Sequence, residues 1–246
     1  MVETVRASVF TTCLVESLYP NVGDALETLL VRLGVEVDVP TRQTCCGQMH
    51  INSGYGSMAV SLIRNHVLAF ADSEAVVAPS ASCVGAVRHQ YEKIALESGD
   101  AELVEAVRAL ANKTYEVSEF LVDVLGVTDV GAYFPHRVTY HPTCHSLRSL
   151  RVGDRPRRLL ERVEAIELVA LPDADVCCGF GGTFAVKNSD VSGAMLFDKL
   201  SCIRRAGAEV VTAADSSCLM QIGGGLSRAG DDVRPLHLVE ILASTR

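Results

Sequence analysis

The chain has 246 residues, enough for one large domain or two small ones, and its 48% apolar and 21% charged residues are ordinary for a globular protein. This composition excludes a mostly disordered chain and a collagen-like or low-complexity one. A net charge of −8 disfavours a phosphate backbone as a partner, so we expect no nucleic acid. There is no signal-peptide start and no apolar run of about 18 residues, so we expect a cytoplasmic protein without a transmembrane segment.

The first half of the chain predicts strands that alternate with helices. Apolar spacing and β-prone runs predict, in chain order, a strand over 8–12, a helix over 22–33, a strand over 35–39, a helix over 57–71, a strand over 75–78 and a helix over 84–97. We expect Asn21 to cap the first of these helices and Gly34 to end it.

The second half predicts the same alternation. The expected elements are a strand over 137–140, a helix over 156–163, a strand over 167–171, a helix over 192–206 and a strand over 209–213. Strands that alternate with helices imply parallel sheets with right-handed crossovers. The sequence therefore predicts the α/β class, with a small Rossmann-like parallel sheet in each half.

Eight of the nine cysteines form a pattern that occurs twice. The first group is Cys13, Cys45, Cys46 and Cys83, and the second, 131 to 135 residues later, is Cys144, Cys177, Cys178 and Cys218. In both groups the paired cysteines are followed by glycine. Because a repeat of about 130 residues is the size of a domain, we predict two tandem domains, 1–133 and 134–246, related by an internal pseudo-two-fold repeat.

Each of the three predicted strands in a half is followed by cysteine. The carboxyl ends of parallel strands share one edge of the sheet, which is where open α/β sheets bind ligands. Adjacent strands lie about 4.8 Å apart, so thiolates from three neighbouring strand ends can meet at one polynuclear centre. The ninth cysteine, Cys202, has no counterpart in the first half and is expected to be a core residue.

Four kinds of role for the repeated cysteines remain open at this point. They could be buried structural residues, zinc ligands, thiol–disulfide exchange groups or iron–sulfur ligands. The chain has no CxxC, the spacing typical of both zinc knuckles and exchange sites, and adjacent cysteines suit a cluster better than one tetrahedral ion. We favour iron–sulfur, because four thiolates per half satisfy a [4Fe–4S] cluster.

The segments around the cysteines resemble the cysteine-rich CCG-domain proteins, and specifically the lactate utilization protein A family. The resemblance covers nearly the whole chain and is carried by residues 33–40, 43–48, 140–145, 177–184 and 215–220. It implies an iron–sulfur electron-transfer subunit of a cytoplasmic system that oxidises L-lactate to pyruvate. It further implies a ferredoxin-like iron–sulfur subunit and a third lactate-utilization subunit as partners. The chain is then a subunit of an oxidoreductase complex rather than a complete enzyme.

The chain departs from the fullest CCG pattern, which ends each half in CxxC. Ser80 and Asp215 stand where the first cysteine of that pair is expected, and we expect both to cap the helices that follow. The alternatives are a redox subunit of the heterodisulfide reductase type, one of the glycolate oxidase type, and a non-redox zinc or thiol assembly subunit.

Other polar residues have less specific interpretations. His50, His141 and His145 lie near cysteines and either serve the metal site, by hydrogen bonding or proton relay, or are turn residues. Lys187 either adds positive charge near the second site or is a solvated surface residue. Three arginines either hold a carboxylate substrate or form a solvated loop: Arg148, Arg151 and Arg155. No flavin or nicotinamide fingerprint is visible.

Overall fold

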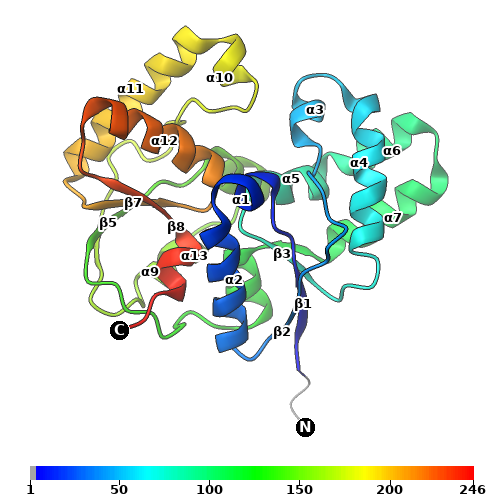
Figure 1. Ribbon diagram of the computed structural model, residues 1–246, viewed down its shortest axis with the longest axis horizontal. Coiled ribbons are helices and arrows are strands. Elements are labelled where there is room, and N and C mark those ends of the chain that lie inside the picture. The colour runs from blue at the N-terminus through cyan, green and yellow to red at the C-terminus, as the bar shows by residue number, and fades with distance from the viewer. Residues whose placement is uncertain (1–3) are drawn as a thin grey trace. The chain divides into compact units, whose positions relative to one another are not determined.

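The structure, a computed structural model, describes residues 4–246, which form two compact units divided between Phe120 and Leu121. Each unit contains one four-stranded sheet whose strands are all parallel, together with its own helices (Figure 1). The predicted α/β class, the small parallel sheets and the tandem repeat are therefore confirmed. The domain boundary between residues 133 and 134 stays a prediction.

The sheet of the first unit has the order β2-β1-β3-β4. Its strands are β1 (Arg6–Val9), β2 (Glu36–Asp38), β3 (Val76–Ala78) and β4 (Thr114–Glu116). Ser8 of β1 pairs with Asp38 on one side and with Val76 on the other. The winding of the chain thus reverses between β1 and β3, and such switch points are the ligand sites of open α/β sheets.

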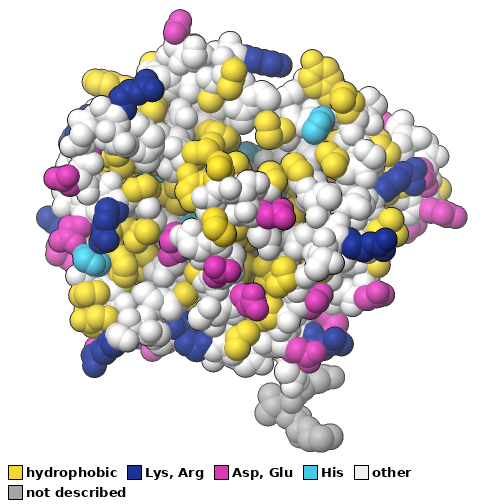
Figure 2. All heavy atoms as spheres, in the orientation of Figure 1, with side chains coloured by type: hydrophobic (Ala, Val, Ile, Leu, Met, Phe, Trp, Pro, Cys, Tyr) yellow, Lys and Arg dark blue, Asp and Glu magenta, His cyan; other side chains and the backbone are white. Residues whose placement is uncertain are grey.

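The helices of the first unit follow its strands. They are α1 (Cys13–Leu18), α2 (Pro20–Arg32), α3 (Gln48–Asn52), α4 (Gly56–Ala69), α5 (Ala81–His89), α6 (Tyr91–Ser98), α7 (Ala101–Asn112) and α8 (Val117–Glu119), after which the π-helix η1 (Phe120–Val124) spans the division. In the first unit α4, α6 and α7 pack together (Figure 1). Acidic side chains gather over α1 and α2 (Figure 2), where Glu16, Asp24 and Glu27 are exposed.

The predicted elements of this unit need several corrections. The first strand, expected over 8–12, is β1 and ends at Val9. The helix expected over 84–97 is two helices, because the backbone breaks at Gln90 between α5 and α6. Asn21 does not cap α2, because the helix begins at Pro20, two residues before the predicted start. Proline is favoured at the first helical position because it has no N–H to leave unpaired. The strand β4 and the helices α1, α3, α7 and α8 were not predicted. Gly34 does lie just beyond the end of α2, with a φ of 81°.

The second unit repeats the arrangement with the order β6-β5-β7-β8. Its strands are β5 (Arg137–Tyr140), β6 (Glu167–Val169), β7 (Val210–Ala213) and β8 (Arg234–His237). Its helices are the π-helix η2 (His145–Leu150), α9 (Arg155–Leu160), α10 (Phe184–Lys187), α11 (Ser189–Ala206), α12 (Ser216–Ala229) and α13 (Leu238–Ala243). In this sheet β5 takes the place that β1 has in the first, so the winding reverses between β5 and β7 and the switch point lies there.

The two units also end alike. In the first, β4 runs into α8 through a capping box formed by Glu116 and Glu119, and in the second, β8 runs into α13 through one formed by His237 and Glu240. Each box satisfies backbone N–H groups at a helix start. The internal repeat thus extends past the cysteines to the last strand and helix of each unit.

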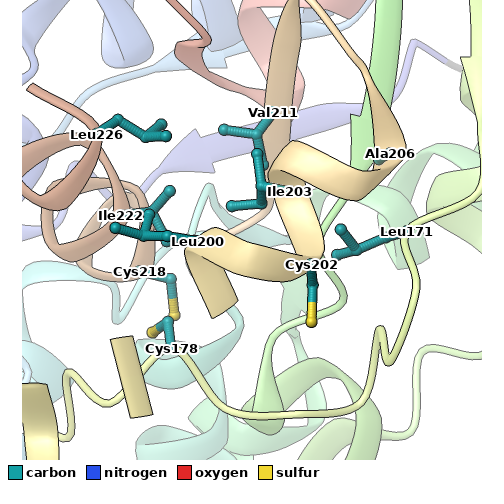
Figure 3. Packing of buried hydrophobic residues seen from close by; sticks show 10 residues of the cluster. All are labelled: Leu171, Cys178, Leu200, Cys202, Ile203, Ala206, Val211, Cys218, Ile222 and Leu226. Carbon is teal, nitrogen blue, oxygen red and sulfur yellow. The ribbon is translucent and has the colours of Figure 1, made fainter. Parts of the chain in front are cut away.

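Helix α11 contributes the largest share of a buried cluster against α12 and β7 (Figure 3). Ile203, Ile222 and Val211 are fully buried there, and Cys178 and Cys218 lie at one end of the cluster. This apolar packing holds the helix that follows one pair of cysteines against the helix that carries Cys218.

Candidate metal centres

The first thiol set lies beyond the carboxyl ends of β1, β2 and β3. Cys13 opens α1, Cys45 and Cys46 end the loop before α3, and Cys83 is in the first turn of α5. Side-chain hydrogen bonds join Cys13 to Cys45, Cys45 to Cys46 and Cys46 to Cys83. The structure therefore brings all four predicted side chains of this half together at the switch point.

The second thiol set has the same layout. Cys144 precedes η2, Cys177 and Cys178 end the loop after β6, and Cys218 is in the first turn of α12. Hydrogen bonds join Cys144 to Cys177, Cys177 to Cys178 and Cys178 to Cys218. Figure 3 shows the sulfur atoms of Cys178 and Cys218 side by side.

Cys202 belongs to neither set. Its side chain is buried on α11, and its sulfur lies apart from those of Cys178 and Cys218 (Figure 3). The Sγ atom instead lies 3.3 Å from Nη2 of Arg205 and 3.8 Å from Oδ2 of Asp173. The prediction that Cys202 is a core residue is confirmed.

One sulfur in each set accepts a backbone hydrogen bond from the glycine of the Cys–Cys–Gly segment. The N–H of Gly47 donates to Sγ of Cys45, and that of Gly179 donates to Sγ of Cys177, both at 3.4 Å. A hydrogen bond from Cys13 lowers the pKa of Cys45 far below the usual 9, and one from Cys144 does the same for Cys177. The glycine N–H groups lower both pKa values further. Each set thus favours a thiolate, the form of cysteine that binds metals.

His66 of α4 is buried beneath the first set. Neither ring nitrogen has a hydrogen-bond partner among the described residues. The ring meets Phe10 edge-on at 4.4 Å and Tyr91 at 5.8 Å, and the Tyr91 hydroxyl donates to the Cys46 carbonyl at 2.8 Å. Burial lowers the pKa of His66 from 6.5 to about 4, so the ring is neutral in the folded protein at pH 7.

The stability of the protein should therefore fall in mild acid. Between pH 6.5 and 4 the unfolded His66 binds a proton that the folded one refuses, which removes about 3 kcal/mol of unfolding free energy. His66→Phe should make that decline shallower by a similar amount, whereas a change at exposed His89, His89→Gln, should follow the parent protein. Urea unfolding followed by circular dichroism at pH 7 and 4.5 gives the unfolding free energy at each pH. An equal loss of unfolding free energy between these pH values in all three proteins would contradict the prediction.

Lys199 of α11 is a buried residue that sequence reasoning missed. Its Nζ donates to the carbonyls of Asp173 and Ala174 at 3.1 and 3.3 Å, in the loop that carries Cys177 and Cys178. Burial lowers its pKa, while the nearby cysteines Cys202, Cys178 and Cys177 oppose that shift. Lys187, the predicted source of positive charge, is exposed. In the sequence, Lys199 stands within an apolar stripe formed by Leu196, Leu200 and Ile203. That position could have indicated that the lysine is buried.

Lys199→Met should keep the apolar stem and lose both hydrogen bonds to the loop. Because each hydrogen bond from a charged group contributes about 2 kcal/mol, we expect the unfolding free energy to fall by at least that amount. The same substitution at exposed Lys187 should leave it unchanged. Chemical denaturation of the two variants measures the difference, and an unaltered Lys199→Met protein would show that the loop does not depend on this lysine.

The remaining candidates are placed variously. His145 has Nδ1 3.6 Å from Sγ of Cys144, and His50 lies half-buried near Cys45. Arg155 is engaged by Asp123, with Nη2 2.7 Å from Oδ2, and Arg148 donates to the carbonyl of Asp175 at 3.3 Å. Arg151 is exposed and has a φ of 56°.

Ser80 and Asp215, which replace cysteines of the fuller pattern, differ from each other. Ser80 caps α5, accepting from the N–H of Cys83 at 3.2 Å, as predicted. Asp215 occupies the N-cap position of α12 without a capping hydrogen bond from its side chain. Its Oδ2 accepts a hydrogen bond from the hydroxyl of Thr143 at 2.9 Å instead. The prediction that the Asp215 side chain caps this helix was therefore wrong, although the residue does stand at the N-cap position.

The donor sets fit a metal centre with several metal ions. Adjacent cysteines direct their sulfurs apart, which suits two ions better than one, and the glycine N–H groups suit a negatively charged sulfur site. In the second unit a ring nitrogen of His141 also lies within 4.8 Å of the sulfurs of Cys178 and Cys218. Both nitrogens of that buried ring lack a hydrogen-bond partner among the described residues, as expected for a group that faces a metal.

The fold and the two thiol sets define a protein made of two cysteine-rich domains. The family model described as CCG, cysteine-rich domain, matches residues 7–88 and 138–223. Among curated relatives, lactate utilization protein A of Oceanobacillus iheyensis is 45% identical over 98% of each chain, and that of Macrococcus caseolyticus is 48% identical over 96% of each. The protein of the same name from Bacillus subtilis strain 168 is 44% identical over 97% of this chain and 99% of its own. The chain belongs to the lactate utilization protein A family.

Solved structures add little to this assignment. An aspartate racemase homologue from Pyrococcus horikoshii OT3 covers 98% of this chain and 96% of its own, at 12% identity and a TM-score of 0.34. That likeness is too low to bear on fold or function. Among residues 4–246, no helix has the length and apolar character needed to span a bilayer.

Proposed function

We propose that this chain is the iron–sulfur electron-transfer subunit of a cytoplasmic system that oxidises L-lactate to pyruvate. The observation that carries the proposal is the convergence of four thiols in each unit, at the switch point of a parallel sheet, in a member of the lactate utilization protein A family. Relatives bearing that name supply the substrate class, and the thiol sets supply the redox chemistry.

Each unit would hold one cluster, most simply [4Fe–4S], through its own four cysteines. The first ligand set is Cys13, Cys45, Cys46 and Cys83, and the second is Cys144, Cys177, Cys178 and Cys218. A bound cluster supplies reversible one-electron transfer, and two of them match the two electrons that L-lactate loses in becoming pyruvate. The chain's own groups would bind the cluster and keep water from it. Glycine N–H groups donate to sulfur, and apolar side chains bury Cys46 and Cys178.

The proposed system has further subunits. A ferredoxin-like iron–sulfur subunit and a third lactate-utilization subunit would deliver electrons to this chain or take them from it. The proton and the hydride equivalent that leave lactate need an acceptor in that assembly, because the chain has no flavin or nicotinamide fingerprint. The heterodisulfide-reductase-like alternative is less favoured, since Ser80, in the place of a fifth cysteine, serves as a helix cap.

Growth on L-lactate tests the proposal. A Bacillus subtilis strain 168 derivative that lacks its own lactate utilization protein A would receive this chain, or a Cys46→Ser, Cys178→Ser double variant. We expect the parent chain and the matched Cys202→Ser control to restore growth on L-lactate as carbon source, and the double variant to fail. Growth of the double variant at the parent rate, with equal protein levels, would refute the role of the thiol sets.

A further inference from the structure

We propose that His141 is a nitrogen ligand of the metal centre in the second unit, so that the two centres of the chain are chemically different. The inference rests on the proposed function, because it assumes that the second thiol set holds metal. It goes further by adding a ligand of another chemical class to one set only.

The position of His141 is fixed by the sheet. The residue follows β5 directly, and its backbone N–H donates to the carbonyl of Thr212 on β7 at 2.7 Å. Its side chain is 1% exposed, and a ring nitrogen lies within 4.8 Å of the sulfurs of Cys178 and Cys218. Three potential ligand atoms from three different segments therefore meet at one buried point.

The ring nitrogens of His141 lack any other explanation within the described residues. Neither one has a hydrogen-bond partner, although both are buried. A buried polar atom without a partner destabilises a fold, so such atoms are rare unless they bind something. A lone pair directed at a metal removes that penalty. Neutral imidazole nitrogen is an established ligand type for iron in clusters that otherwise use thiolates.

The first unit cannot make the same bond. His141 stands three residues before Cys144, and the residue three before Cys13 is Phe10, which follows β1 in the same way and has no donor atom. The buried histidine of the first unit, His66, is on a different element and packs against Phe10. Within residues 4–246, a compact group of three potential metal ligands that includes histidine occurs only in the second unit.

The extra ligand has a consequence for electron distribution. Four thiolates fill the four iron positions of a cubane cluster, so His141 either takes the place of one thiolate or brings the second set to five donors. Where neutral imidazole replaces an anionic thiolate, the reduction potential of the cluster rises. Buried Lys199, whose positive charge is felt by Cys177 and Cys178, acts in the same direction. The second centre should accept an electron before the first.

Nitrogen hyperfine spectroscopy of the reduced, iron-loaded full chain tests the proposal. A background Cys45→Ser, Cys46→Ser variant confines the signal to the second unit. We expect the coupling of a directly bound nitrogen, changed when the protein is grown with ¹⁵N-labelled histidine and lost in His141→Phe. Phenylalanine is the residue that stands at the equivalent position of the first unit, Phe10. His141→Gln, in which the new side chain is polar as histidine is, should lose the coupling as well.

The control is His145→Ala, because Nδ1 of His145 lies 3.6 Å from Sγ of Cys144 and is the competing source of nitrogen. That variant should keep the coupling. The midpoint potential of the second centre should fall in His141→Phe and not in His145→Ala. Iron with no direct histidine coupling, or a coupling lost only in His145→Ala, overturns the role of His141 and leaves the proposed function intact. Absence of iron from the parent chain overturns both.

Discussion

Cys178→Ser should abolish the metal centre of the second unit and leave that of the first. Cys178 is 1% exposed and lies between Cys177 and Cys218 in the chain of hydrogen-bonded thiols, so its loss removes the innermost ligand. A serine hydroxyl is a poor substitute for thiolate toward iron. Iron and acid-labile sulfide per chain should each fall to about half the parent value, because one of two clusters is lost.

Two matched variants give this prediction its controls. Cys46→Ser should remove the equivalent ligand of the first set, with the same loss of about half the iron. Cys202→Ser makes the same chemical change at another buried cysteine of the second unit and should retain full iron. Retention of full iron by Cys178→Ser, or an equal loss in Cys202→Ser, would show that the assigned ligand set is wrong.

Gly179→Ala should be the most damaging single methyl addition near either site. Gly179 has a φ of 87°, and an added Cβ would lie 2.6 Å from the carbonyl oxygen of Ser192 in the backbone of α11. Backbone strain of about 1 kcal/mol and displacement of a helix together should lower unfolding free energy by about 3 kcal/mol or more. The N–H that donates to Sγ of Cys177 would move too, so iron binding in the second unit should be lost.

Gly47→Ala is the matched change in the first unit. Gly47 has a φ of 77°, but its added Cβ would meet the Ala59 side chain at 3.4 Å, an ordinary contact. We expect only the backbone strain of about 1 kcal/mol, with iron retained in both units. Thermal unfolding followed by circular dichroism, with iron analysis on the same samples, compares the two variants. Equal losses of stability would show that the contact with α11 does not matter.

The thiol sets could be predicted because their signal is periodic and chemically specific. Cysteine at three strand ends, repeated about 130 residues later, indicates both the tandem fold and the edge of the sheet at which the side chains meet. The structure brings these cysteines together as that pattern implies. The isolated position of Cys202, which lacks a counterpart, was equally informative.

The missed elements have weaker local signals. β8 contains Pro235 beside Arg234, and β4 is only Thr114–Glu116, so neither presents the apolar run typical of a buried strand. Both are outer strands stabilised by one neighbour in the sheet. The break between α5 and α6 at Gln90 depends on tertiary packing, because nothing in the local sequence forbids a continuous helix there.

The sequence did not indicate that Lys199 is buried, and it left two interpretations of His141 open, for another reason. A lysine or histidine near cysteines is usually solvated or part of a turn, and only burial distinguishes the exceptions. Lys199 is enclosed because the loop before Cys177 folds over its head group, and His141 because it lies between two strand ends. These contacts arise from crossovers between distant segments, which no local pattern encodes.

The central claim, that each unit holds an iron–sulfur cluster, is tested most directly by metal analysis. Iron and acid-labile sulfide should be measured per chain on protein purified without oxygen, with electron paramagnetic resonance spectra before and after reduction. We expect about four to eight irons with matching sulfide and a signal that changes on reduction. Absence of iron after attempted reconstitution, with zinc or free thiols at the eight cysteines instead, would contradict it.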